Sequence, residues 1–169
     1  MEIEIHDDLI PWQQKASIYD YVIKSAYRLG WHDRDDITVN NIYSQWTLDE
    51  FRGTGLLDVY SNISSANDDI DVNRFVRCMV NLSKSGDYNF CHTHKGEIVF
   101  LYYVNLEWKD GYGGETLFYD EELKNANKVC SFVPGRILIF DGEIPHTIRA
   151  QSTYGPEYRF TISYFISKE

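Results

Sequence analysis

The pattern that most constrains the fold lies after Val72, where short apolar segments alternate with glycine-containing turns. Such segments, rich in Val, Ile, Tyr and Phe, are typical of β-strands. Many short strands after a helical beginning indicate an α+β protein with helices packed on one side of a barrel. Eight strands fit a double-stranded β-helix, a jelly-roll or cupin-like barrel that often holds a site in its mouth. The strands are expected near residues 73–83, 88–94, 98–106, 116–119, 128–132, 136–141, 146–150 and 157–167.

An amphipathic helix is expected near the beginning of the chain. Pro11 suits the first turn of a helix, where its missing N–H is not needed. Gly30 is well placed to end this helix. Between the two, the apolar residues that follow helical spacing are Ile18, Val22, Ala26 and Leu29.

A second, shorter helix is predicted by a capping box. Thr47 and Glu50 have the spacing of an N-cap residue and its N3 partner, and Gly53 marks the expected end. Residues 2–5 alternate in polarity, which favours a short edge strand, whereas the polar segment Ser61–Asp71 is expected to be a surface loop. We therefore expect a single domain over residues 1–169, with a helical start to about residue 71 and a β core from about residue 72.

The charge of the chain argues against nucleic acids and anionic membranes as partners. There are 26 acidic and 16 basic residues, which gives a formal net charge of −10, and no run of Lys or Arg occurs. Binding to phosphate backbones is driven by basic patches and counterion release. A small molecule or a peptide is the expected partner.

The cysteines and the first residues bear on the compartment. Cys78, Cys91 and Cys130 are odd in number and lack a C-x-x-C spacing, so we expect free thiols in a reducing compartment. The first residues lack the basic and apolar regions of a signal peptide. No apolar run approaches the ~18 residues needed to span a bilayer. These features predict a cytoplasmic protein.

Three histidines form the most informative candidate site. His92 and His94 are two residues apart, so on a β-strand their side chains point to the same face. His146 can complete a facial set of ligands if antiparallel strands bring it back. Imidazoles presented in this way suit Fe(II) and related ions, and they leave positions open for oxygen and a co-substrate. His6 and His32 neighbour none of these motifs and are expected to be structural or surface residues.

Other residues around the histidines have simpler explanations. Asp141 and Glu143 lie close to His146, but a carboxylate that caps the turn after a strand is the commoner arrangement. Most of the many aromatic residues are expected to be core residues. Candidates for lining a substrate channel are Tyr88, Tyr102 and Tyr119.

The last expected strand has two different faces. Arg159, Thr161 and Ser163 are expected to point into the barrel. A charged guanidinium in a barrel interior is costly unless an anion meets it. Arg159 is therefore the strongest indication of an anionic co-substrate. The residues of the opposite face, expected to pack under the helices, are Tyr158, Phe160, Ile162, Tyr164 and Ile166.

Six short motifs follow one another in about the last hundred residues. They are H-T-H at 92–94, L-Y-Y-V-N at 101–105, G-G-E-T-L-F at 113–118, P-G-R-I-L-I-F-D at 134–141, I-P-H at 144–146 and Y-R-F-T at 158–161. In this order they resemble the prolyl 4-hydroxylase-like branch of the Fe(II)/2-oxoglutarate oxygenases. No single motif is specific, but the ordered set is.

The resemblance implies roles for individual residues. In that family a His-x-Asp pair and a distal His hold iron, and an Arg on the final strand pairs with the far carboxylate of 2-oxoglutarate. The distal His corresponds to His146 and the Arg to Arg159. A bidentate guanidinium–carboxylate pair explains the use of Arg rather than Lys. Tyr103 and a hydroxyl from Ser163 or Thr161 are expected to assist in binding the same carboxylate.

The sequence departs from the family at the first pair, and two alignments are open. In the first, His92 is the first His and His94 occupies the position of Asp, so three neutral imidazoles hold iron. In the second, His94 is the first His and Gly96 occupies the acid position, as in halogenases and aspartyl hydroxylase-like enzymes that leave a coordination site open. We prefer the first alignment, because His92 and His94 share a strand face.

The resemblance implies a dioxygenase that uses Fe(II), 2-oxoglutarate and O2. It would hydroxylate an unactivated C–H bond of a prolyl peptide, an amino acid or another small molecule, with release of succinate and CO2. One alternative is a cupin-like metal-binding or sensing protein without turnover, which has no reason to hold Arg159 inside the barrel. Another is a three-His dioxygenase that does not use 2-oxoglutarate, where Arg159 needs a carboxylate on the substrate. The sequence leaves the oligomeric state open.

Overall fold

The computed structural model describes residues 2–37, 41–67 and 70–169. Its helices are α1 (Trp12–Ile23), α2 (Leu48–Arg52) and α3 (Leu56–Ser64). Its strands are β1 (Glu4–His6), β2 (Arg28–Trp31), β3 (Asn41–Trp46), β4 (Phe75–Lys84), β5 (Glu97–Tyr103), β6 (Thr116–Tyr119), β7 (Ala126–Cys130), β8 (Ile137–Asp141), β9 (His146–Ile148) and β10 (Tyr158–Ser167).

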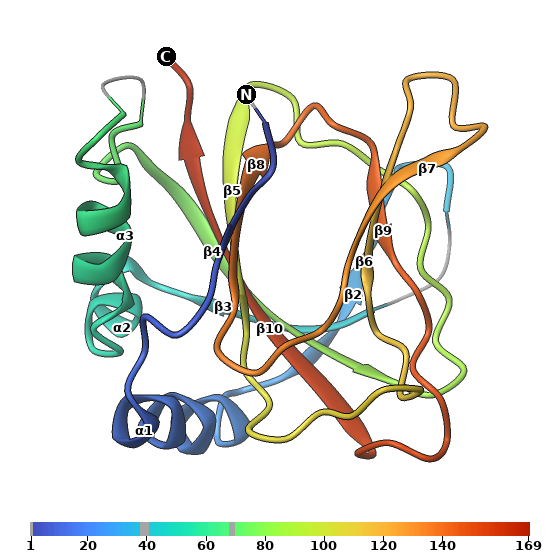
Figure 1. The fold of residues 1–169 in the computed structure, drawn as a ribbon, viewed down its shortest axis with the longest axis horizontal. Helices are drawn as coiled ribbons and strands as arrows, with labels where there is room; N and C mark the ends of the chain where they lie inside the picture. The colour runs from blue at the N-terminus through green and yellow to red at the C-terminus, as the bar shows by residue number, and fades with distance from the viewer. Residues whose placement is uncertain (1, 38–40, 68–69) are drawn as a thin grey trace.

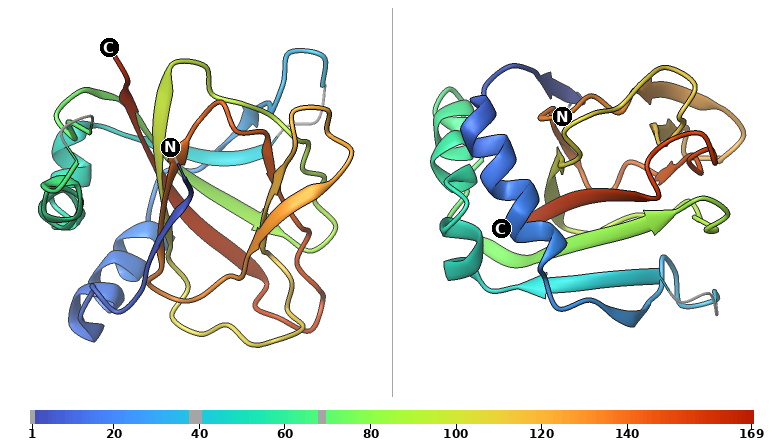
Figure 2. Two further views of the ribbon diagram at one scale, coloured as in Figure 1. Left: turned by 45° about the horizontal axis from the view of Figure 1, so that its top comes forward. Right: turned by 90° about the horizontal axis from the view of Figure 1, so that it is seen from below.

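Two antiparallel sheets face each other, and the helices cover the outer face of the larger one (Figures 1 and 2). The larger sheet has the strand order β1-β8-β5-β10-β4-β3-β2, and the smaller sheet has the order β7-β6-β9. A cavity lined by residues of both sheets holds the candidate site. This arrangement is the α+β double-stranded β-helix that the sequence predicts.

Strand β10 lies in the middle of the larger sheet, between β4 and β5. Its Phe160, Ile162 and Tyr164 belong to the core beneath the helices, whereas Arg159 and the alternate residues face the smaller sheet. This confirms the two faces predicted for the strand. Tyr158 is the exception, since it is 40% exposed at the strand end.

Aromatic packing fixes the helices to the larger sheet. Phe51 of α2 stacks on Tyr164 of β10 with ring centroids 4.4 Å apart, and Tyr60 of α3 stacks on Phe100 of β5 at 4.6 Å. All four side chains are fully buried. Burying one such side chain contributes about 1.5–3 kcal/mol, so this layer supports the strands that carry the site from behind.

The first helix ends earlier than predicted. It stops at Ile23 instead of reaching Gly30, and residues 28–31 form β2, which pairs with β3. Leu29, which was expected on the buried face of the helix, is 67% exposed. Strand pairing with β3 has overridden the helical spacing of these apolar residues. The predicted edge strand and capping-box helix are confirmed as β1 and α2, with Thr47 and Glu50 forming both bonds of the box.

Two further predictions for the first half of the chain were wrong. Helix α3 extends to Ser64, so the first residues of the expected loop Ser61–Asp71 are helical; residues 68–69 lie outside the described residues. Strands β2 and β3 had no counterpart in the prediction and add two strands to the larger sheet.

The strand expected at 88–94 is also absent, apart from a single bridge between His92 and His146. Phe90 explains this, because its N–H bonds to the Asp33 side chain instead of a neighbouring strand.

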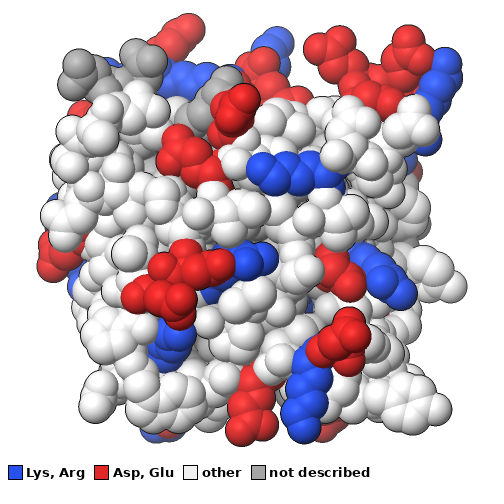
Figure 3. Space-filling view, in the orientation of Figure 1, with Lys and Arg blue, Asp and Glu red and all other residues white. Residues whose placement is uncertain are grey.

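The surface and the helix lengths bear on partners and location. On the face seen in Figure 3, basic side chains are scattered among acidic ones. Among the described residues, no helix is both long and apolar enough to cross a membrane.

Candidate metal and co-substrate site

The three predicted histidines meet at one end of the space between the sheets. The ring centroids of His92, His94 and His146 lie 4.6–5.2 Å apart, and one nitrogen of each lies within 4.8 Å of the others. His92 and His146 exchange two backbone hydrogen bonds of 3.0 Å, which tie the loop before β5 to the start of β9. The backbone N–H of His94 donates to the carbonyl of Gly142 at 2.6 Å. The cluster therefore depends on loop contacts as much as on strands.

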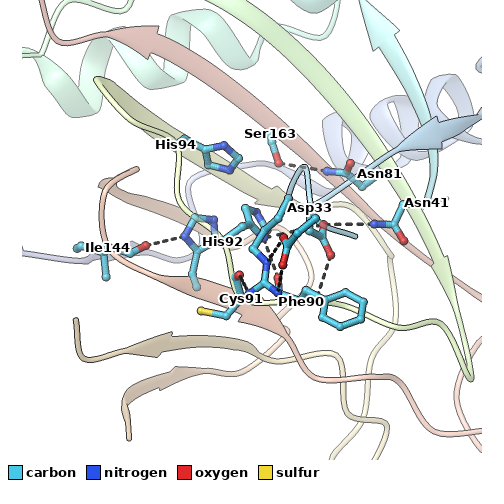
Figure 4. Close-up of polar contacts among 12 residues, drawn as sticks. Asp33, Asn41, Asn81, Phe90, Cys91, His92, His94, Ile144 and Ser163 are labelled. Atoms are coloured by element: carbon cyan, nitrogen blue, oxygen red, sulfur yellow. Dashed lines mark hydrogen bonds and ion pairs between the residues drawn. The ribbon is translucent and has the colours of Figure 1, made fainter. Parts of the chain in front are cut away.

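Two of the rings are oriented as metal ligands. Nδ1 of His92 lies 2.9 Å from the carbonyl oxygen of Phe90, and Nδ1 of His146 lies 2.7 Å from that of Ile144 (Figure 4). A carbonyl only accepts, so each Nδ1 carries the proton. The lone pair is then on Nε2, the usual consequence of such a contact in metal-binding histidines.

The third ring has a different neighbour. Nη2 of Arg77 lies 3.4 Å from Nδ1 of His94, and a guanidinium only donates, so this Nδ1 is the acceptor. Arg77 is held in place by a two-pronged ion pair with Glu97 and by stacking over the ring of Phe165, 3.9 Å from its centroid. In the neutral ring the proton is therefore on Nε2. Metal binding through Nε2 of His94 requires that proton to move to Nδ1 and the Arg77 contact to open.

Two of the three rings have a lowered pKa. Burial, followed by the nearby His92, lowers the pKa of His146 to about 3. Burial, followed by the neighbouring His146, His92 and Arg77, lowers the pKa of His94 to about 2. Neutral imidazoles are the form that binds a metal ion.

The remaining polar candidates lie elsewhere, as expected. His6 contacts Glu4 within β1, and His32 is not part of the cluster. Asp141 accepts a hydrogen bond from the N–H of Glu143 at 2.9 Å, which is the predicted turn cap. The second alignment would need Gly96 to face the metal. Gly96 is exposed in a turn with φ of +74°, and it is not among the residues that line the cavity.

Arg159 lies at the other end of the same cavity and is 2% exposed. Its Nε donates to the carbonyl of Gly114 at 3.0 Å, while Nη2 is buried without a partner. Among the described residues Arg159 forms no ion pair, so the internal salt bridge that would give it a purely structural role is absent. Burial lowers its pKa to about 10, which leaves it charged at neutral pH. A buried guanidinium with an unused N–H is suited to an anionic ligand.

Position 114 suits glycine because of its positive φ and the close approach of the Trp108 and Arg159 side chains. Gly114 has φ of +78°, and a Cβ there would lie 3.1 Å from both Cδ and Nε of Arg159. The second glycine of the G-G-E-T motif is thus explained by close approach of the arginine.

Hydroxyl groups line the cavity or lie just behind its wall. The Tyr103 hydroxyl lies 2.6 Å from Oγ1 of Thr116, and both side chains are buried. Thr161 and Ser163 line the cavity, and Ser163 accepts a hydrogen bond from Asn81 at 3.3 Å. Along β10 Ser163 is closer than Thr161 to Phe165, whose ring contacts His94, so Ser163 lies toward the histidine end.

The expectation for the channel tyrosines was wrong. Tyr102 is fully buried in the core beneath the helices, because successive residues of β5 face opposite sides of the sheet. Neither Tyr88 nor Tyr119 is among the described residues that line the cavity. Tyr103, the other member of the pair, belongs to the core cluster between the sheets, but it is not among the described residues that line the cavity either.

Three residues near the site were missed from sequence. Thr116 had a usable signal, since it belongs to the G-G-E-T motif and opens β6. Arg77 had none, because its position opposite Phe165 depends on how β4 pairs with β10. Asp33 had none either. It lies in the connection between β2 and β3, two strands that the prediction did not include, and its carboxylate reaches the cavity beside His92 (Figure 4).

Solved structures were compared with this fold. A prolyl hydroxylase from Trichoplax adhaerens, solved in complex with a peptide of hypoxia inducible factor, superposes with a TM-score of 0.71 at 20% identity, over 98% of this chain and 84% of that one. A 2OG-Fe(II) oxygenase family protein from Burkholderia pseudomallei gives 0.73 at 11% identity, over 99% and 85%. The chain has the fold of the 2OG-Fe(II) oxygenases.

A third structure agrees with these two. A prolyl-4-hydroxylase from Pseudomonas putida gives a TM-score of 0.68 at 13% identity, over 99% of this chain and 92% of that one. No family model matches the sequence, and no curated protein matches it either. The likeness in sequence is therefore carried by the short motifs and the likeness in fold by the whole chain.

Proposed function

We propose that this protein is an Fe(II)- and 2-oxoglutarate-dependent oxygenase that hydroxylates an unactivated C–H bond. One observation carries the proposal: a single cavity holds three clustered imidazoles at one end and a buried guanidinium with an unused N–H at the other. A metal-binding or sensing protein needs only the first of these features. The buried Arg159 is costly unless an anion binds there, which favours an enzyme with an anionic co-substrate.

The residues divide the work between the two ends. His92, His94 and His146 would hold Fe(II), a set of neutral nitrogen donors that suits this ion. Arg159 would bind the far carboxylate of 2-oxoglutarate, with hydroxyls of Tyr103 and Thr161 nearby. When bound, iron and 2-oxoglutarate supply the oxidising chemistry, with succinate and CO2 as the products. The apolar side chains that line the walls exclude water from the cavity; they include Val99, Leu101 and Phe140.

We infer that the substrate is a peptide or a small molecule. Support comes from the Trichoplax structure, which was solved with a peptide. In this chain, the amide side chains of Asn41, Asn81 and Asn89 line the cavity together with Trp31. Amides both donate and accept hydrogen bonds and suit a peptide backbone. A cytoplasmic location stays a prediction.

Succinate production tests the proposal. The Fe(II)-loaded protein is expected to convert 2-oxoglutarate slowly to succinate even without its substrate. A peptide or amino acid that is the substrate should accelerate this conversion, which gives a way to screen candidates. His146→Ala is expected to produce none. Tight Fe(II) binding without succinate formation, with or without such candidates, would favour the metal-binding or sensing alternative.

A further inference from the structure

Asp33 is a buried carboxylate beside the histidine cluster. Its side chain is 9% exposed and lines the cavity. Oδ2 accepts a hydrogen bond from the N–H of Phe90 at 2.8 Å, and Oδ1 accepts one from Asn41 Nδ2 at 3.2 Å. Oδ1 also lies 3.9 Å from Nδ1 of His92 (Figure 4). The carboxylate is thus directed at a candidate metal ligand by two fixed contacts.

No cationic side chain neutralises this carboxylate among the described residues. The adjacent Arg34 pairs with Asp36 and donates to the carbonyl of Cys91 instead. A buried carboxylate is costly when it has only neutral donors, because they replace part of its hydration but not an opposite charge. A divalent cation held by the histidines is the charge that this part of the cavity lacks.

The His92 ring lies between the Asp33 carboxylate and the proposed cation, so the carboxylate can act on the cation through this ring. Nδ1 of His92 faces two acceptors, the carbonyl of Phe90 and the carboxylate of Asp33. Both favour the ring form with the proton on Nδ1 and the lone pair on Nε2. A carboxylate behind a metal-binding histidine also makes that histidine a stronger donor to the metal.

We propose that Asp33 is a positioning residue that tightens metal binding at the cluster, by holding the Phe90–His92 segment and by supplying negative charge behind His92. The inference rests on the proposed metal site. It also compensates for a property of the H-T-H motif: three neutral imidazoles bring no negative charge to the metal. A carboxylate from the β2–β3 connection supplies it from outside the ligand set.

Asp33→Asn removes the charge of the side chain but keeps its hydrogen bond with Phe90, and Asn41 can turn its amide so that its oxygen accepts from the new NH2 group. The amide oxygen can still accept from the N–H of Phe90, so a purely structural role predicts no change. We expect the dissociation constant for Mn(II), measured by titration calorimetry or by electron paramagnetic resonance of free Mn(II), to rise about 10–100-fold. Asp36→Asn is the matched control, since this exposed carboxylate on the same connection pairs with Arg34, and it should bind Mn(II) like the wild type.

The outcomes distinguish this inference from the proposed function. Equal Mn(II) affinity for Asp33→Asn and the wild type would overturn the role of Asp33 and leave the metal site standing; it is also the result expected if Asp33 binds a cationic substrate instead. An equal loss in Asp33→Asn and Asp36→Asn would overturn it as well, because the effect would then be that of net charge. A wild type that does not bind Mn(II) or Fe(II) would overturn both proposals. Circular dichroism confirms that each variant is folded.

Discussion

The two ends of the cavity are built in different ways. Arg159 lies near the start of β10, where it pairs with Ser83 of β4, while Tyr103 comes from β5 of the same sheet and Thr116 from β6 of the smaller sheet. At the other end, His92 and His94 come from an irregular segment. It is held by two backbone hydrogen bonds to His146, by one to Gly142, and by one from Phe90 to the Asp33 side chain. The anion end is therefore built on paired strands, whereas the metal end is built on a loop.

His94 shows what this difference means for binding. Arg159 has a free N–H and needs no change to receive a carboxylate. His94 must exchange its contact with Arg77 before its Nε2 can bind a metal. We expect the metal to organise its own end and the co-substrate to meet an end that is already formed.

The largest effect is expected from a substitution that removes a metal ligand. His146→Ala removes one of the three imidazoles but keeps the backbone hydrogen bonds to His92. Stoichiometric Fe(II) binding is therefore expected to be lost while the fold persists. Anaerobic Fe(II) titration measures the loss, and circular dichroism checks the fold. His6→Ala is the control, since His6 lies in β1 outside the cluster. Full iron occupancy in His146→Ala would show that the metal is bound elsewhere.

The next largest effect is expected from a substitution that removes the anion-binding arginine alone. Arg159→Leu should keep iron but lose about 2–5 kcal/mol of 2-oxoglutarate binding, roughly thirty-fold to several thousand-fold, because a shielded charge-assisted pair is removed. Arg159→Lys should recover part of the affinity, since it keeps the charge but not the forked geometry. Calorimetry on the metal-loaded protein measures both. Unchanged affinity in Arg159→Leu would place the co-substrate outside this pocket.

A smaller effect concerns the third ligand. His94→Asp should retain Fe(II), with tighter binding than the wild type, because a carboxylate adds negative charge and has no ring proton to move. His94→Ala should weaken Fe(II) binding by at least about tenfold, with partial recovery when azide is added as an external anion. Anaerobic titration of Fe(II) compares them. Loss of iron in His94→Asp together with its retention in Gly96→Asp would instead support the second alignment.

The last effect is a pH dependence of the metal-free protein. The pKa values of His146 and His94, about 3 and about 2, lie below the ~6.5 of an unfolded histidine. Between these values the unfolded chain binds protons that the folded chain does not, so the free energy of unfolding should fall as the pH drops below about 6.5. The slope is about 1.4 kcal/mol per pH unit for each imidazole. Urea unfolding at pH 7, 6 and 5 measures it, and an equal slope in His94→Gln/His146→Gln would contradict this origin.

The two ends also differ in how far the sequence could predict them. The inward direction of Arg159 follows from strand alternation, which has a period of two and holds along the whole of β10. His92 and His94 were brought together correctly, but for a reason that proved wrong, since the segment is not a strand. Asp33 and Arg77 could not be assigned roles, because their contacts depend on how separate loops and strands meet in three dimensions.

The most direct test of the account is an anaerobic titration of the Fe(II)-loaded protein with 2-oxoglutarate, followed by the weak visible charge-transfer band of the iron chelate. One ligand is expected to span both ends of the cavity. The band should therefore appear and saturate in the wild type, require far more 2-oxoglutarate in Arg159→Leu, and be absent in His146→Ala. A wild type that binds Fe(II) but develops no band, or a band that saturates at the same concentration in Arg159→Leu, would contradict the account.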